Sequence, residues 1–299
     1  MPERAGRGSI ADALDAAIAR LERAGLPDPR REATTLWAAV ASPGTRPGEV
    51  WLRRDNAPPT EVAERFRDAV ERRSSGIPFA YAVGRASFRN LELKLDARAL
   101  IPRPETEGLV DVVLAWARDR GRGDARMWGV AADVGTGCGC VALSLAVEGR
   151  FERVIAVERS GDAAALAREN VALVGPLVPV EVHEGDLVGP LAGERCRVLV
   201  ANPPYLSADE YAALDPAVRL FEPPAALVSG AEGLDATGAI LAGAAAVLEP
   251  GGLLALEIDE RRAERVRALA AQHGWTRVAI HEDLFGRPRY LMAVSREGA

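Results

Sequence analysis

From about residue 105 to the end of the chain, short apolar runs alternate with amphipathic segments of helical length, for example 161–173 and 236–248. The apolar runs lie at 130–134, 154–157, 178–182, 198–201, 253–258, 278–280 and 290–294. This alternation predicts an α/β fold with a mostly parallel sheet that is covered by helices on both faces. Ligands of such sheets bind at the carboxyl ends of the strands, and the unusual residues of this sequence lie at those ends.

The first 76 residues have a different pattern, which is typical of a small helical unit. Ser9 and Asp12 have the spacing of a capping box, and apolar residues at helical spacing follow until Gly25. Two further helices are expected to begin at Asp28-Pro29 and at Thr60. We therefore expect a helical domain at residues 1–76.

The segment that follows this helical unit alternates between apolar and polar residues around Arg89-Asn90, which predicts a β-hairpin. We expect residues 77–104 to form a hairpin linker and residues 105–299 to form the α/β domain. Because the N-terminal domain carries none of the motifs described below, we expect it to recognise the substrate rather than take part in chemistry.

Composition excludes several classes of protein. With 48% hydrophobic and 27% charged residues, the chain is not disordered, and no stretch approaches the roughly 18 apolar residues of a membrane span. The N-terminal segment lacks the pattern of a signal peptide. Three cysteines and three widely spaced histidines indicate neither a disulfide framework nor a metal site. We expect a cytoplasmic, metal-free protein that does not bind membranes.

Charge is distributed unevenly along the sequence. Residues 1–100 carry 17 basic and 14 acidic side chains, whereas the rest carry 20 and 29. An acidic C-terminal two-thirds is poorly suited to a nucleic-acid backbone and better suited to a cationic ligand.

A glycine-rich turn follows the first strand of the α/β domain, with the sequence Asp133-Val-Gly135-Thr136-Gly137-Cys138-Gly139. Glycines at alternate positions allow a tight turn and close approach of the backbone to a ligand. The turn departs from the dinucleotide fingerprint because Cys140 stands where its third glycine belongs. Asp133 would also repel a pyrophosphate, so a nicotinamide-dependent oxidoreductase is disfavoured.

Two further carboxylates follow the next strands. Glu158 ends the second strand, where an acidic side chain binds ribose hydroxyls, and Asp186 follows the third. Three carboxylates around a glycine turn suit an adenosyl ligand that is positively charged and has no phosphate, such as S-adenosylmethionine. The simpler interpretation is a tight turn with helix-capping and surface acids. Cys138 and Cys140 are interpreted as small packing residues rather than as metal ligands.

A second motif, Asn202-Pro203-Pro204-Tyr205, follows the fourth strand. The prolines fix the backbone and remove two N–H donors, which leaves the Asn202 oxygen and backbone carbonyls as acceptors beside an aromatic ring. This array suits a planar NH₂ group conjugated to a carbonyl or a ring. Two hydrogen bonds would aim its lone pair at an electrophilic methyl group, which is a positioning effect. The alternative is an ordinary Asn-Pro-Pro turn.

These two motifs together resemble those of class I S-adenosylmethionine-dependent methyltransferases that act on amide or exocyclic amino nitrogen. Three further parts of the sequence are similar to peptide-chain-release-factor glutamine methyltransferases: PFAYAVGRASFRNLELKLDARALIPRPETEGLV, VRLFEPPAALVSGAEGLD and DLFGRPRYLMA. The form Arg103-Pro104-Glu105-Thr106-Glu107 favours this branch over the related ribosomal-protein methyltransferases. The resemblance implies a Rossmann-like seven-stranded sheet with an N-terminal helical domain.

The resemblance also implies a reaction. A methyl group would pass from S-adenosylmethionine, leaving S-adenosylhomocysteine, to the side-chain amide nitrogen of the glutamine in the GGQ loop of release factors. The predicted catalytic residues are Asn202, Pro203 and Tyr205, and Asn202, Pro203, Pro204 and Tyr205 would bind the substrate. The predicted cofactor residues are Asp133, Gly135, Thr136, Gly137, Cys138, Gly139, Glu158, Asp186, Leu187 and Asn202. The family usually has aspartate where this chain has Glu158, and the role of Cys138 stays open.

Other functions compete with this interpretation. The exocyclic amino group of adenine also fits the Asn202–Tyr205 array, so a nucleic-acid amino-methyltransferase is the alternative. The acidic α/β domain and the lack of an evident target-recognition domain argue against it. A non-catalytic adaptor is disfavoured by the intact array. We expect a monomer whose partner is a release factor and which has no direct nucleic-acid substrate.

Overall fold

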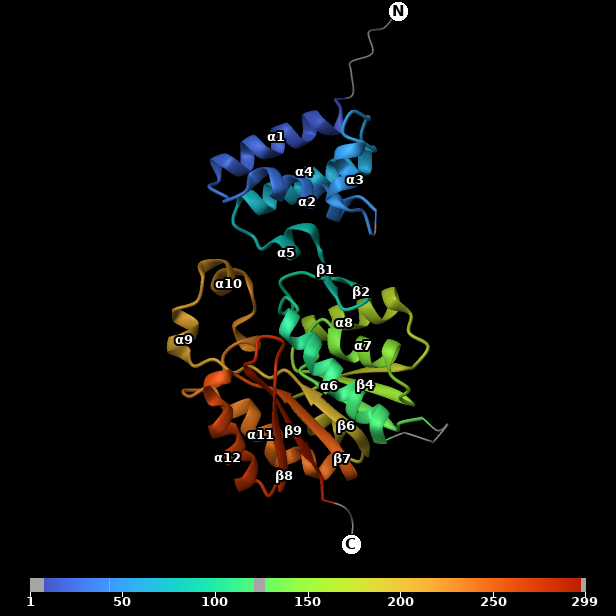
Figure 1. Cartoon of the computed structure of the whole chain (residues 1–299), viewed down its shortest axis with the longest axis vertical. Coiled ribbons are helices and arrows are strands. Elements are labelled where there is room, and N and C mark those ends of the chain that lie inside the picture. Colours follow the sequence, from blue (N-terminus) through green and yellow to red (C-terminus); the bar gives the residue numbers. More distant parts are fainter. Residues whose placement is uncertain (1–7, 43, 121–126, 297–299) are drawn as a thin grey trace, which may run out of the picture. The chain divides into compact units, whose positions relative to one another are not determined.

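A computed structural model describes residues 8–42, 44–120 and 127–296, and the chain divides into two compact units, Met1–Arg85 and Ala86–Ala299. Figure 1 shows the helices of the first unit and the sheet of the second.

The first unit is helical. The predicted capping box is confirmed: Ser9 Oγ accepts from the Asp12 N–H, and the Asp12 carboxylate accepts from the Ser9 N–H. The Asp28 cap accepts from the Arg31 N–H and is followed by proline, as predicted. The helices are α1 (Ile10–Arg23), α2 (Pro29–Val40), α3 (Pro47–Leu52), α4 (Thr60–Ser74) and α5 (Phe79–Val83).

The core of this unit forms where α1, α2 and α4 pack together. Leu21 and Leu36 are fully buried, and the rings of Trp37 and Phe66 meet edge to face at 4.7 Å. Phe79 and Val83, which lie within the linker predicted from the sequence, pack against this core. The sequence did not reveal α3 and α5 because helices of six and five residues show no periodicity.

The second unit begins with the predicted hairpin, which is confirmed. Strands β1 (Arg85–Phe88) and β2 (Leu91–Lys94) form a two-stranded sheet that turns at Arg89-Asn90. Arg89 has a φ of 52° in this turn, and its guanidinium donates to both carboxylate oxygens of Glu148 at 2.7 and 2.8 Å. This bidentate pair fixes the hairpin to α7 (Cys140–Glu148).

A seven-stranded sheet forms the centre of the second unit, and the predicted Rossmann-like fold class is confirmed. Its strand order is β5-β4-β3-β6-β7-β9-β8, and β9 runs antiparallel to both of its neighbours. The strands are β3 (Val130–Val134), β4 (Arg153–Glu158), β5 (Val180–Glu184), β6 (Cys196–Ala201), β7 (Leu248–Glu257), β8 (Arg277–Glu282) and β9 (Pro288–Val294).

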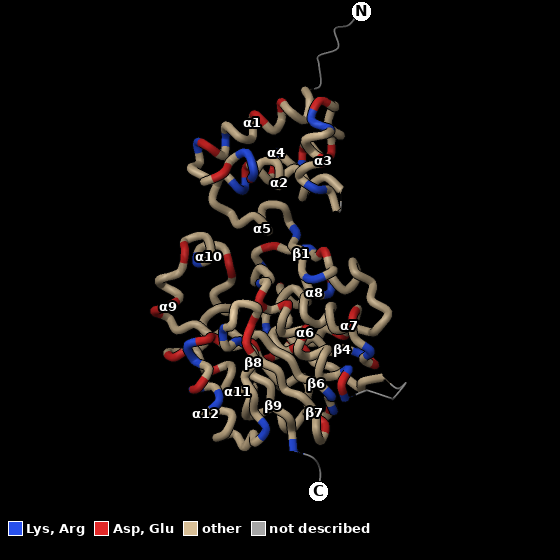
Figure 2. Tube along the Cα trace, viewed as in Figure 1, with Lys and Arg blue, Asp and Glu red and all other residues tan. Residues whose placement is uncertain are grey.

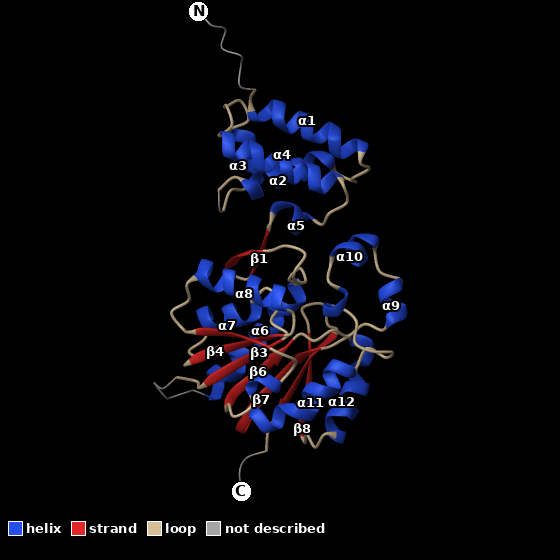
Figure 3. Cartoon of the chain, turned by 180° about the vertical axis from the view of Figure 1, so that it is seen from behind, coloured by secondary structure: helices blue, strands red, loops and turns tan. Residues whose placement is uncertain are grey.

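Helices cover both faces of this sheet (Figure 3). One face carries α6 (Pro104–Arg120), α7 and α8 (Gly161–Val174); the other carries α11 (Asp235–Val247) and α12 (Ala263–Gln272). Between β6 and α11 the chain forms α9 (Ala208–Ala212) and α10 (Pro216–Phe221). Single 3₁₀ turns lie at Gly189–Leu191, Pro224–Ala226 and Glu260–Arg262. Because both faces are covered, the central strands are almost entirely apolar and buried.

Strand register brings the motifs to one edge of the sheet. Val134 at the end of β3 pairs with Val157 on one side and Ala201 on the other. The glycine turn, Glu158 and Asn202 therefore follow three adjacent parallel strands at their carboxyl ends. In the part of the chain that the structure describes, no helix has the length and apolar character needed to cross a membrane.

Candidate active site

A pocket of about 270 Å³ lies at the carboxyl ends of β3, β4, β5 and β6. Most of the residues predicted from the sequence line it: Asp133, Gly135, Thr136, Gly137, Cys138, Glu158, Asp186, Leu187, Asn202, Pro203 and Pro204. Gly139 and Tyr205 are not among its lining residues.

The glycine turn has the left-handed backbone that its residues allow. Gly135, Gly137 and Gly139 have φ values of 75°, 56° and 87°. The N–H groups of Gly135 and Thr136 both donate to the carbonyl oxygen of Val157 on the neighbouring strand, at 2.8 and 3.0 Å. Gly139 lies against helix α7, since a Cβ there would be 3.5 Å from Leu143 Cδ1.

Asp133 lies beneath this turn and is 1% exposed. One of its oxygens, Oδ2, accepts from the Thr136 hydroxyl at 2.6 Å and from the Ala142 N–H at 3.1 Å. Burial raises the pKa of Asp133 to about 7, against the opposing effect of these hydrogen bonds. Asp133 thus joins the turn to the start of α7. Ionisation of its buried carboxyl group costs free energy unless a cationic partner is present.

Glu158 lies at the end of β4 with each of its oxygens bonded to the backbone. Oε2 accepts from the Gly137 N–H and Oε1 from the Ser160 N–H, both at 2.9 Å. A carboxylate oxygen has two lone pairs, so each oxygen can still accept a hydroxyl from a ligand. Glu158 therefore fixes the glycine turn and presents acceptors to the pocket at the same time.

The Gly185-Asp186-Leu187 segment follows β5. A Cβ at Gly185 would overlap the ring of Pro190, so glycine is required there. Leu187 has a φ of 49°, which is a strained backbone conformation for a bulky residue. Residues with such strained conformations occur most often at functional sites. Asp186 is largely exposed, and its carboxylate lies 3.9 Å from the Arg159 guanidinium.

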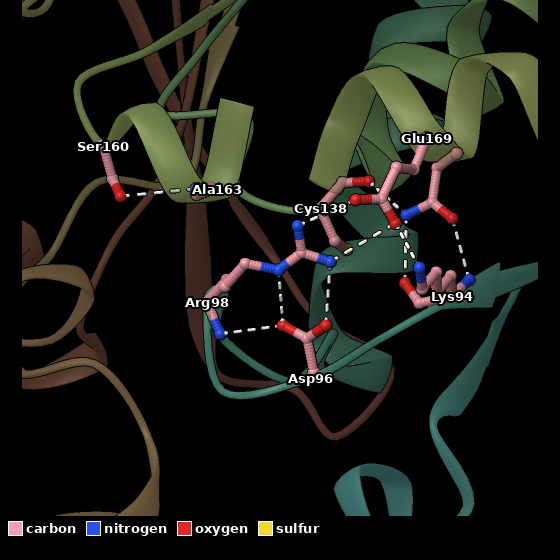
Figure 4. A network of polar contacts seen from close by, with 8 residues as sticks. Lys94, Asp96, Arg98, Cys138, Ser160, Ala163 and Glu169 are labelled. Atoms are coloured by element: carbon pink, nitrogen blue, oxygen red, sulfur yellow. Dashed lines mark hydrogen bonds and ion pairs between the residues drawn. The ribbon is translucent and has the colours of Figure 1, made fainter. Parts of the chain in front are cut away.

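A polar network supports one wall of the pocket (Figure 4). The Arg98 guanidinium lies between the carboxylates of Asp96 and Glu169, with hydrogen bonds of 2.8 Å to each. The Asn170 side chain is fully buried and donates to the carbonyl oxygens of Lys94 and Cys138, at 3.0 and 2.9 Å. These contacts tie the hairpin and the segment after it to α8, and α8 to the glycine turn. Arg98, Ala99 and Leu100 of that segment line the pocket.

A second wall is formed by the segment after α10. The Glu222 side chain is 1% exposed; its carboxylate accepts from the Arg103 guanidinium at 2.6 Å and from the Ile101 N–H at 3.2 Å. Pro223, Ala225 and Ala226 follow and line the pocket with Pro102 and Arg103.

The Asn202–Tyr205 segment follows β6, the strand beside the one that leads into the glycine turn. Its far end is held by a bridge in which the Leu206 N–H donates to the Leu227 carbonyl and the Ser229 N–H donates to the Leu206 carbonyl, both at 2.9 Å. The Asn202 side-chain nitrogen donates to the Thr106 hydroxyl at 3.0 Å. Burial raises the pKa of Tyr205 to about 12, so its hydroxyl stays neutral.

The two cysteines of the turn both line the pocket. A hydrogen bond with Cys138 and, to a smaller extent, burial raise the pKa of the Cys140 thiol well above its usual value. This thiol is therefore not a reactive thiolate. Among the residues that the structure describes, no cluster of three or more histidine, cysteine or acidic side chains could hold a metal ion.

Several lining residues were not identified as site residues from the sequence: Arg98, Ala99, Leu100, Pro102, Arg103, Thr106, Gly185, Pro223, Ala225, Ala226 and Ile240. Thr106 and Pro223 belong to segments in which family resemblance was recognised but to which no role was assigned. Gly185 lies between the end of β5 and Asp186. A glycine at such a position indicates that a ligand or another part of the backbone approaches the chain closely.

Two family models match the sequence: the PrmC N-terminal domain at residues 12–84 and the methyltransferase small domain at residues 124–229. Release factor glutamine methyltransferases of Cereibacter sphaeroides and Deinococcus radiodurans are both 38% identical to this chain. Each alignment covers 95% of this chain, and 97% and 98% of the relatives.

Solved structures share the fold at lower identity. A methyltransferase from Pyrococcus furiosus is 19% identical with a TM-score of 0.50, covering 76% of this chain and 99% of that one. The hMettl16 catalytic domain, solved in complex with a MAT2A 3′UTR hairpin, is 17% identical with a TM-score of 0.54, covering 78% and 80%. At such identities these neighbours support the fold alone.

The full-length relatives extend across both units of this chain, the family models match each unit separately, and the pocket lies at the sheet edge that the two motifs predict. This chain belongs to the release factor glutamine methyltransferase family.

Proposed function

We propose that this protein transfers a methyl group from S-adenosylmethionine to the side-chain amide nitrogen of the glutamine in the GGQ loop of peptide chain release factors. The observation that carries this proposal is the position of Asn202 and its two prolines in one pocket with the glycine turn and its acids.

The chemistry of the pocket fits S-adenosylmethionine, which supplies an electrophilic methyl group on a sulfonium. The Asp133 carboxyl is buried, and the hydrogen bonds that the structure shows to it come from the neutral Thr136 hydroxyl and Ala142 N–H, which suits a ligand with an ammonium group. Glu158 offers acceptors to ribose hydroxyls, and the apolar side chains of Leu187 and Ile240 offer a surface for a base. The three arginines that line the pocket, Arg98, Arg103 and Arg159, each lie beside a carboxylate, which makes them less available to a phosphate.

Asn202 would hold the substrate amide. Its nitrogen is engaged by Thr106, which leaves the side-chain oxygen to accept one N–H of the glutamine. A backbone carbonyl of the Pro203-Pro204 pair would accept the other, and Tyr205 would support the amide plane. With both protons bound, the nitrogen lone pair is oriented toward the methyl group. No strong base is required, because the product amide can lose its proton after the methyl transfer.

Charge supports a protein substrate over a nucleic acid. Acidic and basic residues are interleaved along the second unit (Figure 2), and many of its arginines are paired with carboxylates. These paired arginines are less available to bind phosphates than the arginines of a solvent-exposed basic stripe would be. We propose that the protein acts on release factors as a monomer in the cytoplasm.

A transfer assay with labelled S-adenosylmethionine tests this proposal. Purified release factor, DNA and RNA are offered separately, and label is measured on filters. We expect label on the release factor only. Label on DNA or RNA with none on the release factor would favour the nucleic-acid alternative and contradict the proposal.

A further inference from the structure

A buried carboxylate lies behind Asn202 and is connected to it through one hydroxyl. Glu257, at the end of β7, is 1% exposed, and Thr106, in the first turn of α6, is 3% exposed. The Thr106 hydroxyl donates to Glu257 Oε2 at 2.7 Å. The same hydroxyl oxygen accepts from Asn202 Nδ2 at 3.0 Å. The three side chains therefore form one continuous chain of hydrogen bonds that ends in the pocket.

The position of Thr106 is fixed by neighbouring contacts. The Tyr290 hydroxyl on β9 donates to the Glu105 carbonyl at 2.6 Å. Gly108 lies against the Tyr290 ring so closely that a Cβ would overlap it, which lets the first turn of α6 approach the sheet. The Thr106 N–H donates to the Arg103 carbonyl at 3.0 Å. Thr106 is therefore held between β7 and Asn202 by backbone and side-chain contacts.

The direction of the hydrogen bonds determines which end of the Asn202 amide faces the pocket. A threonine hydroxyl has a single proton, and here the Glu257 carboxylate accepts it. The hydroxyl can then only accept from Asn202, so the amide nitrogen must face Thr106. The amide oxygen is left on the opposite side, where an acceptor for the substrate is needed.

We infer that Thr106 and Glu257 are positioning residues that hold Asn202 with its side-chain oxygen toward the substrate amide. This inference rests on the proposed function of Asn202. It explains why an acid is buried directly after the apolar run 253–256 of β7, where an aliphatic side chain would avoid the cost of burying a carboxyl group.

Protonation of Glu257 would remove this control. A neutral carboxyl group can donate as well as accept, so Thr106 could then donate to the Asn202 oxygen and turn the amide around. Burial raises the pKa of Glu257 to about 7. The charged and titratable groups that face Glu257 from its surroundings are Arg103, Glu105, Tyr205, Arg289 and Tyr290.

The test uses single-turnover methylation of release factor at saturating cofactor, so that changes in cofactor affinity do not enter. Thr106→Val keeps the shape of the side chain and removes both hydrogen bonds; we expect the rate to fall about tenfold to a hundredfold, as for other groups that orient a ligand-contacting side chain. Thr106→Ser should restore most of the rate. Thr34→Val, which removes a buried hydroxyl in the first unit, is the matched control and should keep the parent rate.

Two further measurements separate positioning from a general structural role. In an Asn202→Ala background, Thr106→Val should have little additional effect, because the hydroxyl acts through Asn202. The parent rate should fall as the pH decreases through about 7, whereas Glu257→Gln should give a lower rate with a weaker dependence on pH, because Asp133 still titrates in this range.

The outcomes distinguish this inference from the proposed function. An active parent whose folded Thr106→Val variant keeps the parent rate would overturn the positioning role alone, and so would full additivity of the Thr106 and Asn202 substitutions. A parent that does not methylate release factor would contradict the proposed function and the positioning role together.

Discussion

Arg103 and Glu222 form an ion pair of 2.6 Å between segments that lie 119 residues apart in the sequence. Arg103 directly precedes α6, and Glu222 directly follows α10. Because residues beside both of them line the pocket, this pair joins two walls of the candidate active site.

Glu222→Gln should reduce the free energy of unfolding. The substitution keeps the shape of the side chain but removes a charge-assisted hydrogen bond to Arg103, which is worth about 1.5–3 kcal/mol. Denaturant unfolding of the second unit measures the change. Glu264→Gln, at an acid whose side chain is 84% exposed, is the matched control and should change stability by less than about 0.5 kcal/mol. Equal stability of the two variants would contradict a structural role for the Arg103–Glu222 pair.

Glu158→Ala should weaken S-adenosylmethionine binding. The substitution removes acceptors for the ribose hydroxyls and also frees the Gly137 N–H. Loss of a hydrogen bond to a charged group costs about 1.5–3 kcal/mol, which corresponds to a roughly tenfold to hundredfold weaker affinity. Calorimetry measures the affinity for S-adenosylmethionine. Glu184→Ala on the neighbouring strand is the control, since Glu184 pairs in register with Glu158 but does not line the pocket. Unchanged affinity in folded Glu158→Ala would refute this placement of the cofactor.

Asp133 should make the stability of the cofactor-free protein depend on pH. Its pKa is about 7 in the folded protein and near 3.8 when unfolded, so between these values the folded state holds the proton that the unfolded state releases. Its contribution to stability is therefore full below about pH 4 and is lost as the pH rises to about 7. Asp133→Asn should become more stable relative to the parent over this range, by on the order of a few kcal/mol. Parallel stability profiles for the two proteins would show that Asp133 titrates normally.

The sequence predicted the elements that have strong periodicity or clear end signals. The strand at 130–134, the Ser9 capping box and the hairpin turn at Arg89-Asn90 are confirmed, since each depends on local chemistry. The sequence could not reveal contacts between distant segments. Thr106, Glu222 and Glu257 acquire their surroundings only when α6, the segment after α10 and β7 come together, and no local pattern reports that proximity.

We propose that the N-terminal unit recognises the protein partner. Because Phe79 and Val83 pack with its helices, a shortened chain should begin at Arg85 rather than at Gly76. This chain retains every residue that lines the pocket, so it should bind S-adenosylmethionine with the parent affinity but methylate intact release factor far more slowly. Full activity of the shortened chain would show that recognition lies in the second unit.

Asn202→Ala should reduce the rate of methyl transfer by about a hundredfold to a thousandfold, which is typical for the loss of an oriented polar group at the reacting centre. Cofactor affinity should fall much less, because Asn202 is one of many residues in the pocket. Tyr205→Ala should mainly weaken substrate binding by removing the aromatic face. Single-turnover rates at saturating cofactor separate these effects. A folded Asn202→Ala variant within a few-fold of the parent would refute the proposed role of this residue.

We propose that the methyl acceptor is the amide nitrogen of one glutamine in the release factor. Mass spectrometry tests it directly, by intact mass and then fragmentation of release factor that has been incubated with this protein and S-adenosylmethionine. We expect a gain of one methyl group that maps to the glutamine of the GGQ loop and is absent when that glutamine is replaced by alanine. An unmodified release factor, or a methyl group on any other residue, would contradict it.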